Sequence, residues 1–313
     1  MELKIQKLKD QWIKLKQQEQ YKKIRIKDAA DLLNVSEAEL LSTTIGNNTE
    51  FIKSSNWSFF LQEISSIGEM MYLIRNDDVV HENITTIAKL NILDNQFIEL
   101  YSNQSQTIIN VLLIKFAFVT TAIIRGKSVH SFQLFDKSGK AIIKIYLKNN
   151  NQSEFDAIKN KYQAPYKYEL QKLMKNQNIE GQKANLKKNL ISYIDHFQNN
   201  QNYSIELMEK MNYEKSTISL HNYLIKIVET KSKITIGINN GAALQTYSGY
   251  IENVIHKFNW LNIMDKNFNL HIKDENIKSI FYDRNNDELN IFGLNGHLLY
   301  VKKIVFENES QLN

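Results

Sequence analysis

The 313-residue sequence contains no cysteine, only one proline and ten glycines. The absence of cysteine excludes disulfide bonds, thiolate metal sites and a cysteine nucleophile, so any metal ligand must be histidine, a carboxylate, tyrosine or methionine. The sequence also lacks a Gly-x-Gly-x-x-Gly, a P-loop and a Gly-x-Ser-x-Gly motif, which argues against nucleotide-binding enzymes and α/β-hydrolases. Its most apolar run, residues 108–124, is interrupted by Lys115 and is shorter than a membrane span, so we expect buried strands there.

A large excess of charge of either sign is missing as well. The net charge is +5, from 39 Lys+Arg against 34 Asp+Glu, which suits an anionic ligand but is too small to argue for nucleic acid. The N-terminus is charged throughout and has no apolar core of a signal peptide. We therefore expect a cytoplasmic protein with no nucleic-acid partner and no membrane insertion.

The first 40 residues have a helical pattern. Leu8 and Trp12 belong to a row of apolar residues at three- to four-residue spacing, and a second helix is predicted over 27–33. Ser36 and Glu39 fit a capping box at the start of a third helix. Two short helices around a tight turn resemble a helix-turn-helix, although ordinary helical pairs have the same pattern.

The rest of the chain alternates between strand-rich and helical segments. Residues 68–147 contain short β-rich runs separated by turn residues, and 135–147 predicts a hairpin. Residues 152–190 are polar and helical and contain the single proline, Pro165. After a second helical set, β-rich runs resume and continue to the C-terminal region.

This order of segments repeats along the chain. Residues 72–85 align with 236–249, which puts His81 on Gln245, and weak identities in the same order relate ILDNQF (92–97) to IMDKNF (263–268) and 134–147 to 291–304. We predict an α+β fold of two tandem, similar halves, each a large antiparallel β-sheet with flanking helices. The predicted domains are an N-terminal repeat over 1–160, a helical linker region over 161–185 and a C-terminal repeat over 186–313.

Several segments in collinear order resemble the hemin-degrading factor family (HemS, HmuS and ChuS type), and the resemblance covers almost the whole chain. The resembling segments are Asn34 to Leu40, Arg75 to Glu82 (RNDDVVHE), Ser131 to Asp136 (SFQLFD), Asn259 to Ile263 (NWLNI) and Phe268 to His271. Members of this family are built of two tandem similar halves. The resemblance therefore implies the same architecture that the internal repeat predicts.

The resemblance implies a cytoplasmic haem-binding protein of bacterial haem uptake, with heme as cofactor and hemin as partner. Family members carry or store hemin, and some degrade it oxidatively with a reductant to release iron. A haem importer and a reductant protein are the further partners that it implies, for a monomer or a dimer. Two alternatives stay open: a non-catalytic haem chaperone, and a diverged relative without haem that acts as an interaction module.

His81 is the first candidate ligand of the haem iron. By its residues alone it is an ordinary turn histidine, but it falls on the family's first-half histidine in the Arg-Asn-x-x-x-Val-His-Glu setting. The resemblance thus makes its imidazole a candidate axial ligand. Arg75, six positions earlier, is a candidate partner for a haem propionate, and its alternative is a solvated arginine at a strand end.

The second half departs from the family pattern. An ungapped alignment puts Ser192 where the family has its axial histidine, and His196 lies one helical turn later. His196 is therefore either a second candidate iron ligand or a surface histidine beside Asp195. Asn240 stands in place of a family arginine that contacts a propionate. These losses rank His81 first among the candidate ligands, and the sequence assigns no catalytic residue.

Overall fold

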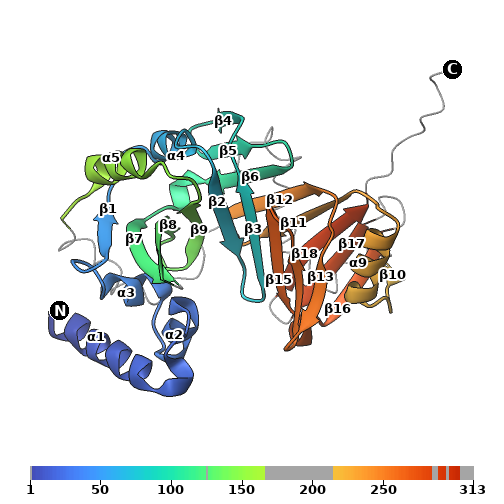
Figure 1. Ribbon diagram of the computed structural model, residues 1–313, viewed down its shortest axis with the longest axis horizontal. Helices are drawn as coiled ribbons and strands as arrows, with labels where there is room; N and C mark the ends of the chain where they lie inside the picture. The colour runs from blue at the N-terminus through green and yellow to red at the C-terminus, as the bar shows by residue number, and fades with distance from the viewer. Residues whose placement is uncertain (1, 125, 166–213, 284–287, 294–295, 304–313) are drawn as a thin grey trace. The chain divides into compact units, whose positions relative to one another are not determined.

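The computed structural model describes residues 2–124, 126–165, 214–283, 288–293 and 296–303 (Figure 1). The chain divides into two compact units. Unit 1 comprises Met1–Tyr72, Ile92–Ile98 and Asn110–Ala184. Unit 2 comprises Leu73–Asn91, Glu99–Ile109 and Asn185–Asn313. Each unit thus combines segments that are far apart in the sequence.

The N-terminal helices of unit 1 follow the predicted pattern. They are α1 (Glu2–Gln17), the 3-10 turn η1 (Glu19–Tyr21), α2 (Ile26–Leu32) and α3 (Glu37–Ser42). Ser36 and Glu39 form the predicted capping box, and Leu8 and Trp12 of α1 pack with Leu40 of α3. Every residue of α3 is buried. The second helix of this pair consequently has no exposed side chain with which it could enter a DNA groove.

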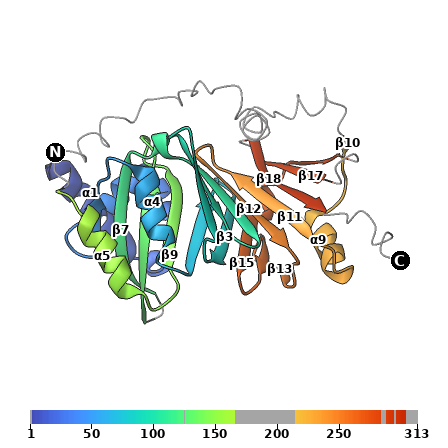
Figure 2. The same ribbon diagram turned by 90° about the horizontal axis from the view of Figure 1, so that it is seen from above.

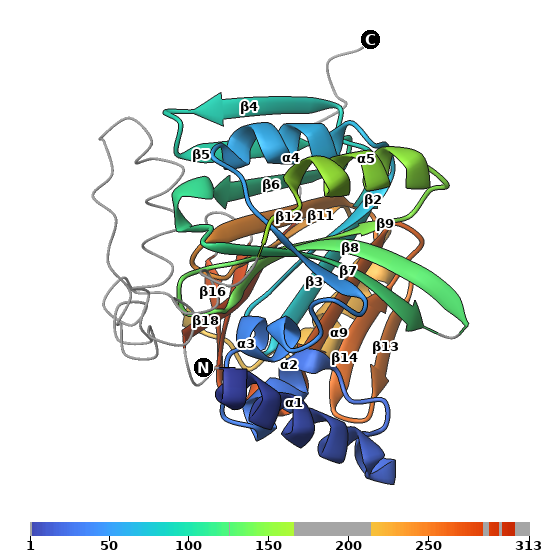
Figure 3. The ribbon, with the colours of Figure 1, turned by 90° about the vertical axis from the view of Figure 1, so that its left-hand side faces the viewer.

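The strands of unit 1 form an antiparallel sheet with helices on both faces. Its core strands pair in the order β1 (Thr49–Ile52), β7 (Phe116–Ile124), β8 (Lys127–Phe135) and β9 (Ala141–Leu147). Helices α4 (Trp57–Ser65) and α5 (Gln152–Tyr162) cover one face, where Phe132 lies between Phe60 and Phe155 with ring centroids 5.6 and 4.4 Å away. Helices α1 to α3 lie on the other face (Figures 2 and 3).

Two sequence predictions are confirmed in this sheet. The 135–147 hairpin is the β8–β9 pair, closed by a hydrogen bond from the Asp136 N–H to the Lys140 carbonyl, with Gly139 at φ +79° in the turn. The apolar run 108–124 consists of the end of β6 (Ser105–Asn110), the 3-10 turn η2 (Val111–Leu113) and β7. Phe116 to Thr120 of β7 are all buried, so a strand buried on both faces, and not a membrane helix, accounts for most of that run.

The remaining elements are the other strands of the two sheets, together with helix α9 and the 3-10 turn η4. They are β2 (Met70–Arg75), β3 (Val79–Thr85), β4 (Lys89–Leu93), β5 (Phe97–Tyr101), β10 (Glu214–Lys215), α9 (Leu220–Glu229), β11 (Ile234–Asn239), β12 (Ala243–Gly249), β13 (Val254–Lys257), β14 (Trp260–Met264), β15 (Phe268–Lys273), the 3-10 turn η4 (Asp274–Asn276), β16 (Ser279–Asp283), β17 (Glu288–Gly293) and β18 (Gly296–Lys303). Within unit 2, β3 pairs with β15 and β12 pairs with β6, both antiparallel.

The strand orders confirm the predicted pair of similar halves. They are β1-β7-β8-β9-β2-β3-β15-β14-β13 in one sheet and β10-β16-β17-β18-β11-β12-β6-β5-β4 in the other. The two orders match strand for strand, and β2 and β3 align with β11 and β12 without a gap. In each sheet the last three strands come from the opposite half of the sequence. The halves therefore complete each other's sheets by exchanging a three-stranded meander.

One of the internal alignments is wrong. The β4–β5 turn is matched in strand order by the β13–β14 turn, and not by the β14–β15 turn that the ILDNQF/IMDKNF alignment selects. The backbone agrees, because Asp94 and Asn95 are left-handed in the first turn (φ 49° and 55°) and Phe258 and Asn259 in the second (φ 52° and 61°). An Asp and a Phe at the same spacing in two neighbouring turns produced the false match.

The predicted domain boundaries near 160 and 185 remain predictions. Most of the predicted linker lies in residues 166–213, which are outside the described part of the chain. The two compact units do show that residues 73–91 and 99–109 of the first repeat group with the second repeat. The reason is the strand pairing of β3 with β15 and of β6 with β12.

Candidate functional site

His81 lies inside unit 2, in the middle of strand β3. Val79, His81 and Asn83 alternate with more exposed residues along the strand, as expected where one face of a strand is buried. His81 is 0% exposed and stands opposite Leu270 of β15 in the strand register. The candidate ligand is consequently a strand residue of a packed core, and not part of a turn.

A hydrogen-bond chain fixes the His81 ring. Its Nδ1 lies 3.1 Å from Oε1 of Gln245, and Nε2 of Gln245 donates to the hydroxyl of Thr107 at 3.1 Å. Because Oε1 of Gln245 can only accept, the neutral ring must carry its proton on Nδ1. Nε2 of His81 is then left with a lone pair. The internal repeat aligns His81 with Gln245, so these two equivalent positions meet each other directly.

The environment of the ring keeps it neutral. Burial lowers the pKa of His81 to about 4, against smaller opposing effects from Gln245 and from the backbone of Ile236. By the geometry of the described residues, Nε2 of His81 makes no hydrogen bond. Phe268 contacts the ring edge-on at 5.0 Å and stacks on Tyr247 at 4.1 Å.

Arg75 does not share this environment. It ends strand β2, and the N–H of Asn76 donates to the Val79 carbonyl at 3.1 Å to close the β2–β3 hairpin. Antiparallel pairing from that turn puts Ile74 opposite His81. Side chains alternate between the faces of a strand, so Arg75 points to the face opposite to that of His81. The structure therefore does not bring the two sequence candidates together.

The other candidates cannot be placed in the same way. His196 and Ser192 lie in 166–213, outside the described residues. Asn240 is described, and its Oδ1 accepts backbone N–H groups of Ala242 and Ala243 in the β11–β12 turn. Across the described residues, no group of three or more His, Asp or Glu side chains is arranged to hold a metal ion.

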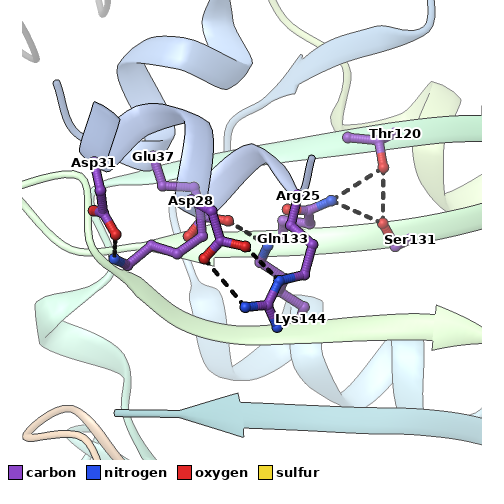
Figure 4. Close-up of polar contacts among 9 residues, drawn as sticks. Arg25, Asp28, Asp31, Glu37, Thr120, Ser131, Gln133 and Lys144 are labelled. Atoms are coloured by element: carbon purple, nitrogen blue, oxygen red, sulfur yellow. Dashed lines mark hydrogen bonds and ion pairs between the residues drawn. The ribbon is translucent and has the colours of Figure 1, made fainter. Parts of the chain in front are cut away.

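A second buried polar cluster lies in unit 1, between α3 and the sheet (Figure 4). Nζ of Lys144 on β9 lies 2.5 Å from Oε1 of Glu37, and the two side chains are only 8% and 2% exposed. Gln133, opposite Lys144 in the strand register, donates to the hydroxyls of Thr120 and Ser131 at 3.1 Å each. This ion pair connects the helical layer to the sheet across the interior of unit 1.

Sequence reasoning missed both sets of partners. A signal for Gln245 was present, because the internal alignment had already matched it to His81. Lys144 also stands out, since it is the single charged residue in the apolar strand AIIKIYL. Its partner Glu37 lies 107 positions away on a helix, and only the tertiary structure shows that pairing.

Two family models match different parts of the chain. The model for haem utilisation ChuX/HutX matches residues 50–164, and the model for the haemin-degrading HemS.ChuX domain matches residues 206–298. With the exchanged sheets described above, these matches define a tandem protein of the haem-utilisation class. The chain belongs to the HemS/ChuS-type hemin-degrading family.

The chain is similar in sequence to a curated protein and similar in fold to two solved structures. The hemin transport protein HmuS of Yersinia pestis is 25% identical over 263 residues, covering 79% of this chain and 75% of that protein. The heme-degrading enzyme ChuS of Escherichia coli O157:H7 superposes with a TM-score of 0.81 at 18% identity over 98% of this chain and 96% of that one. Holo-PhuS, a heme-binding protein from Pseudomonas aeruginosa, has a TM-score of 0.77 at 19% identity, over 96% and 94% of the two chains.

No helix within the described residues is long and apolar enough to cross a membrane.

Proposed function

We propose that this protein binds haem in bacterial haem uptake and that it accepts hemin in the cytoplasm to carry, store or degrade it. The membership in the HemS/ChuS-type family carries this proposal. A histidine supplies the axial ligand of the iron, with His81 and His196 as the candidates, and Arg75 is the candidate propionate partner. A haem importer delivers the hemin, and a reductant protein is required if haem is degraded.

The chemistry of His81 fits a haem ligand, whereas its burial does not. A neutral imidazole that is anchored through Nδ1–H and has an unpaired Nε2 is the form that ligates iron. However, the ring is 0% exposed, so the iron can reach Nε2 only if neighbouring strands move apart. Arg75 also lies on the other face of the hairpin. The sequence ranks His81 first among the candidate iron ligands. Because His81 is buried, we now favour His196 as the ligand.

Purified protein mixed with one equivalent of hemin is expected to give a shifted and sharpened Soret band. Axial coordination by imidazole in an apolar pocket replaces the broad spectrum of free, aggregated hemin. Absorbance titration measures the stoichiometry. If the spectrum stays that of free hemin at stoichiometric protein, haem binding is disproved and the second alternative, an interaction module without haem, is left.

Separate substitutions at the two histidines assign the ligand. We expect His196→Ala to shift the Soret band and weaken hemin binding at least tenfold, and His81→Gln to leave the spectrum unchanged. Glutamine is the matched choice at position 81, because it is polar, similar in length and can keep a hydrogen bond to Gln245. Far-UV circular dichroism and a thermal melt show whether each variant is folded.

The reverse result has a definite meaning. If folded His81→Gln loses the Soret shift and His196→Ala keeps it, His81 is the ligand and the core of unit 2 opens around β3 to admit haem.

Ascorbate added to the haem complex in air separates a carrier from a degrading protein, since only degradation abolishes the Soret band. Persistence of the band under reduction favours the haem chaperone.

A further inference from the structure

One face of the unit 2 sheet carries no fully buried residue along β3, β14 and β15. Buried and partly exposed residues alternate along each of these strands, and the buried set, which includes His81, forms the core. The partly exposed set lies on the opposite face, which we call the open face. Arg75, at the end of β2, lies on this same face, because it points away from the side of His81.

A straight row of residues crosses the open face. His271 of β15 lies directly opposite Val80 of β3 and Asn262 of β14. Asn262 in turn lies opposite Ile255 of β13, and the β2–β3 hairpin puts Arg75 opposite Val80. A histidine and an arginine therefore share one face, two strand spacings or about 9–10 Å apart in the backbone. The histidine that accompanies Arg75 in unit 2 is thus His271, and not His81.

Asn262 holds the ring of His271 in a defined state. Nδ2 of Asn262 donates to the carbonyls of Ile255 and Trp260, at 3.2 and 3.0 Å, and these bonds fix the orientation of the amide. Oδ1 of Asn262 therefore faces Nδ1 of His271, at 2.7 Å, and it can only accept. The neutral ring consequently carries its proton on Nδ1 and its lone pair on Nε2. An imidazole anchored through Nδ1–H by a neighbouring group is the usual arrangement of a metal-ligating histidine.

Exposure distinguishes His271 from His81. Both rings are anchored through Nδ1, but His81 is 0% exposed, whereas His271 is partly exposed. An iron can therefore approach His271 from the open face without any separation of strands. Apolar side chains for the macrocycle lie close by: Val80 and Ile255 belong to the same row, and Trp260 lies in the next row, opposite Lys273.

Charges of both signs lie on the open face and at its hairpin end. The charged residues are Arg75, Lys257, Lys273, Asp77, Asp78 and Glu82. Glu82 and Asp78 each accept a hydrogen bond from a neighbouring asparagine amide. Because the signs are mixed, net charge does not select a ligand for this face. The anchored histidine does, and Arg75 in its row is a group that can pair with a propionate.

We propose that the open face of unit 2 binds a second hemin, with His271 as the axial ligand of its iron and Arg75 as the partner of a propionate. This inference rests on the proposed function, and it adds a site to the one for which His196 is the expected ligand. A sheet face removes less of the macrocycle from water than a buried pocket does, so the second hemin should bind more weakly than the first. Weaker binding suits a site where hemin is received or passed on.

Hemin titration of the full chain, followed at the Soret band, tests the second site. We expect wild type to take up two equivalents, and His271→Asn to take up only the tighter one. Asparagine keeps a donor for Asn262 but has no imidazole nitrogen for iron. Asn262→Val should weaken the second equivalent about tenfold or more, because it removes the group that orients the ring, and it should leave the first equivalent unchanged. His196→Ala should keep the weaker equivalent.

His256→Asn is the matched control. His256 is also exposed and lies on the neighbouring strand β13, but it stands opposite the buried Leu261 and hence on the other face. This variant should take up two equivalents, and a thermal melt shows whether each variant is folded. If His271→Asn does not fold, Asn262→Val decides alone, and an unchanged affinity for the second equivalent overturns the inference.

The other contradicting results are equally definite. The second site is disproved if wild type takes up a single equivalent, if folded His271→Asn still takes up two, or if His256→Asn loses the second equivalent as well. Uptake of one equivalent by wild type leaves the proposed function intact. Absence of any hemin binding overturns the proposed function and the second site together.

Discussion

Lys144→Met is expected to lower the free energy of unfolding by about 3–5 kcal/mol at pH 7. The substitution leaves the Glu37 carboxylate inside unit 1, 2% exposed, without the ammonium group that lies 2.5 Å from it. A buried charge without its partner is far less stable than the same charge in water, and methionine cannot hydrogen-bond to it. Urea unfolding followed by circular dichroism measures the loss.

The control is the double variant Glu37→Gln with Lys144→Met. Once the carboxylate is gone, no buried charge is left unpaired, so most of the stability should return. Glutamine keeps the size of Glu37 and its place in the first turn of α3. The single variant Glu37→Gln is measured as well. If the stability losses of Lys144→Met and Glu37→Gln simply add in the double variant, the ion pair does not couple α3 to β9 and this explanation of the cluster is wrong.

Acidification from pH 6.5 to pH 4 is expected to destabilise the protein through His81 by roughly 3 kcal/mol. The pKa of His81 is lowered from 6.5 to about 4 by burial. Above pH 6.5 the ring is neutral in both the folded and the unfolded state, so it has no effect. Between the two pKa values only the unfolded chain binds the proton, and unfolding is favoured as the pH falls. Below pH 4 both states are protonated and no further loss follows.

His81→Gln isolates this effect from the carboxylates that titrate in the same range. The difference in unfolding free energy between wild type and variant should be constant above pH 7 and should shrink steadily between pH 6.5 and 4. Glutamine does not titrate, so the acid loss through this position disappears. A difference that is independent of pH would mean that the folded protein binds a proton at His81 as readily as the unfolded chain does, and that the ring is open to solvent.

The surroundings of His81 also bear on the proposed haem chemistry. The hydrogen-bond chain from His81 through Gln245 to Thr107 gives the imidazole a defined tautomer. The whole His81 residue is buried, at 0% exposure. Through this hydrogen-bond chain, His81 of β3 in the first repeat contacts Gln245 of β12 in the second repeat. His81 can therefore match the family pattern without touching haem, which is why the ligand assignment needs substitutions at both histidines.

Local chemistry explains how much of the fold was predictable. The capping box at Ser36 and the β8–β9 turn at Gly139 depend on residues within a few positions of each other, so the sequence shows them directly. The relation of β2 and β3 to β11 and β12 was visible because that segment repeats without a gap. Short strand β1 and helix α4 were not predicted, since their residues alternate weakly and are set by packing against β7 and β8.

The candidate site was less predictable, for a physical reason. The sequence determined the tandem α+β architecture, the family, and the identity of His81 as a residue of interest beside a short turn. Only the tertiary structure decided that His81 is buried, that Arg75 faces the other way, and that Gln245 and Glu37 are the partners of His81 and Lys144. Burial and pairing in these sheets depend on strands that are 100 to 200 positions apart, such as β3 with β15. No local pattern of residues encodes which of those distant strands will meet.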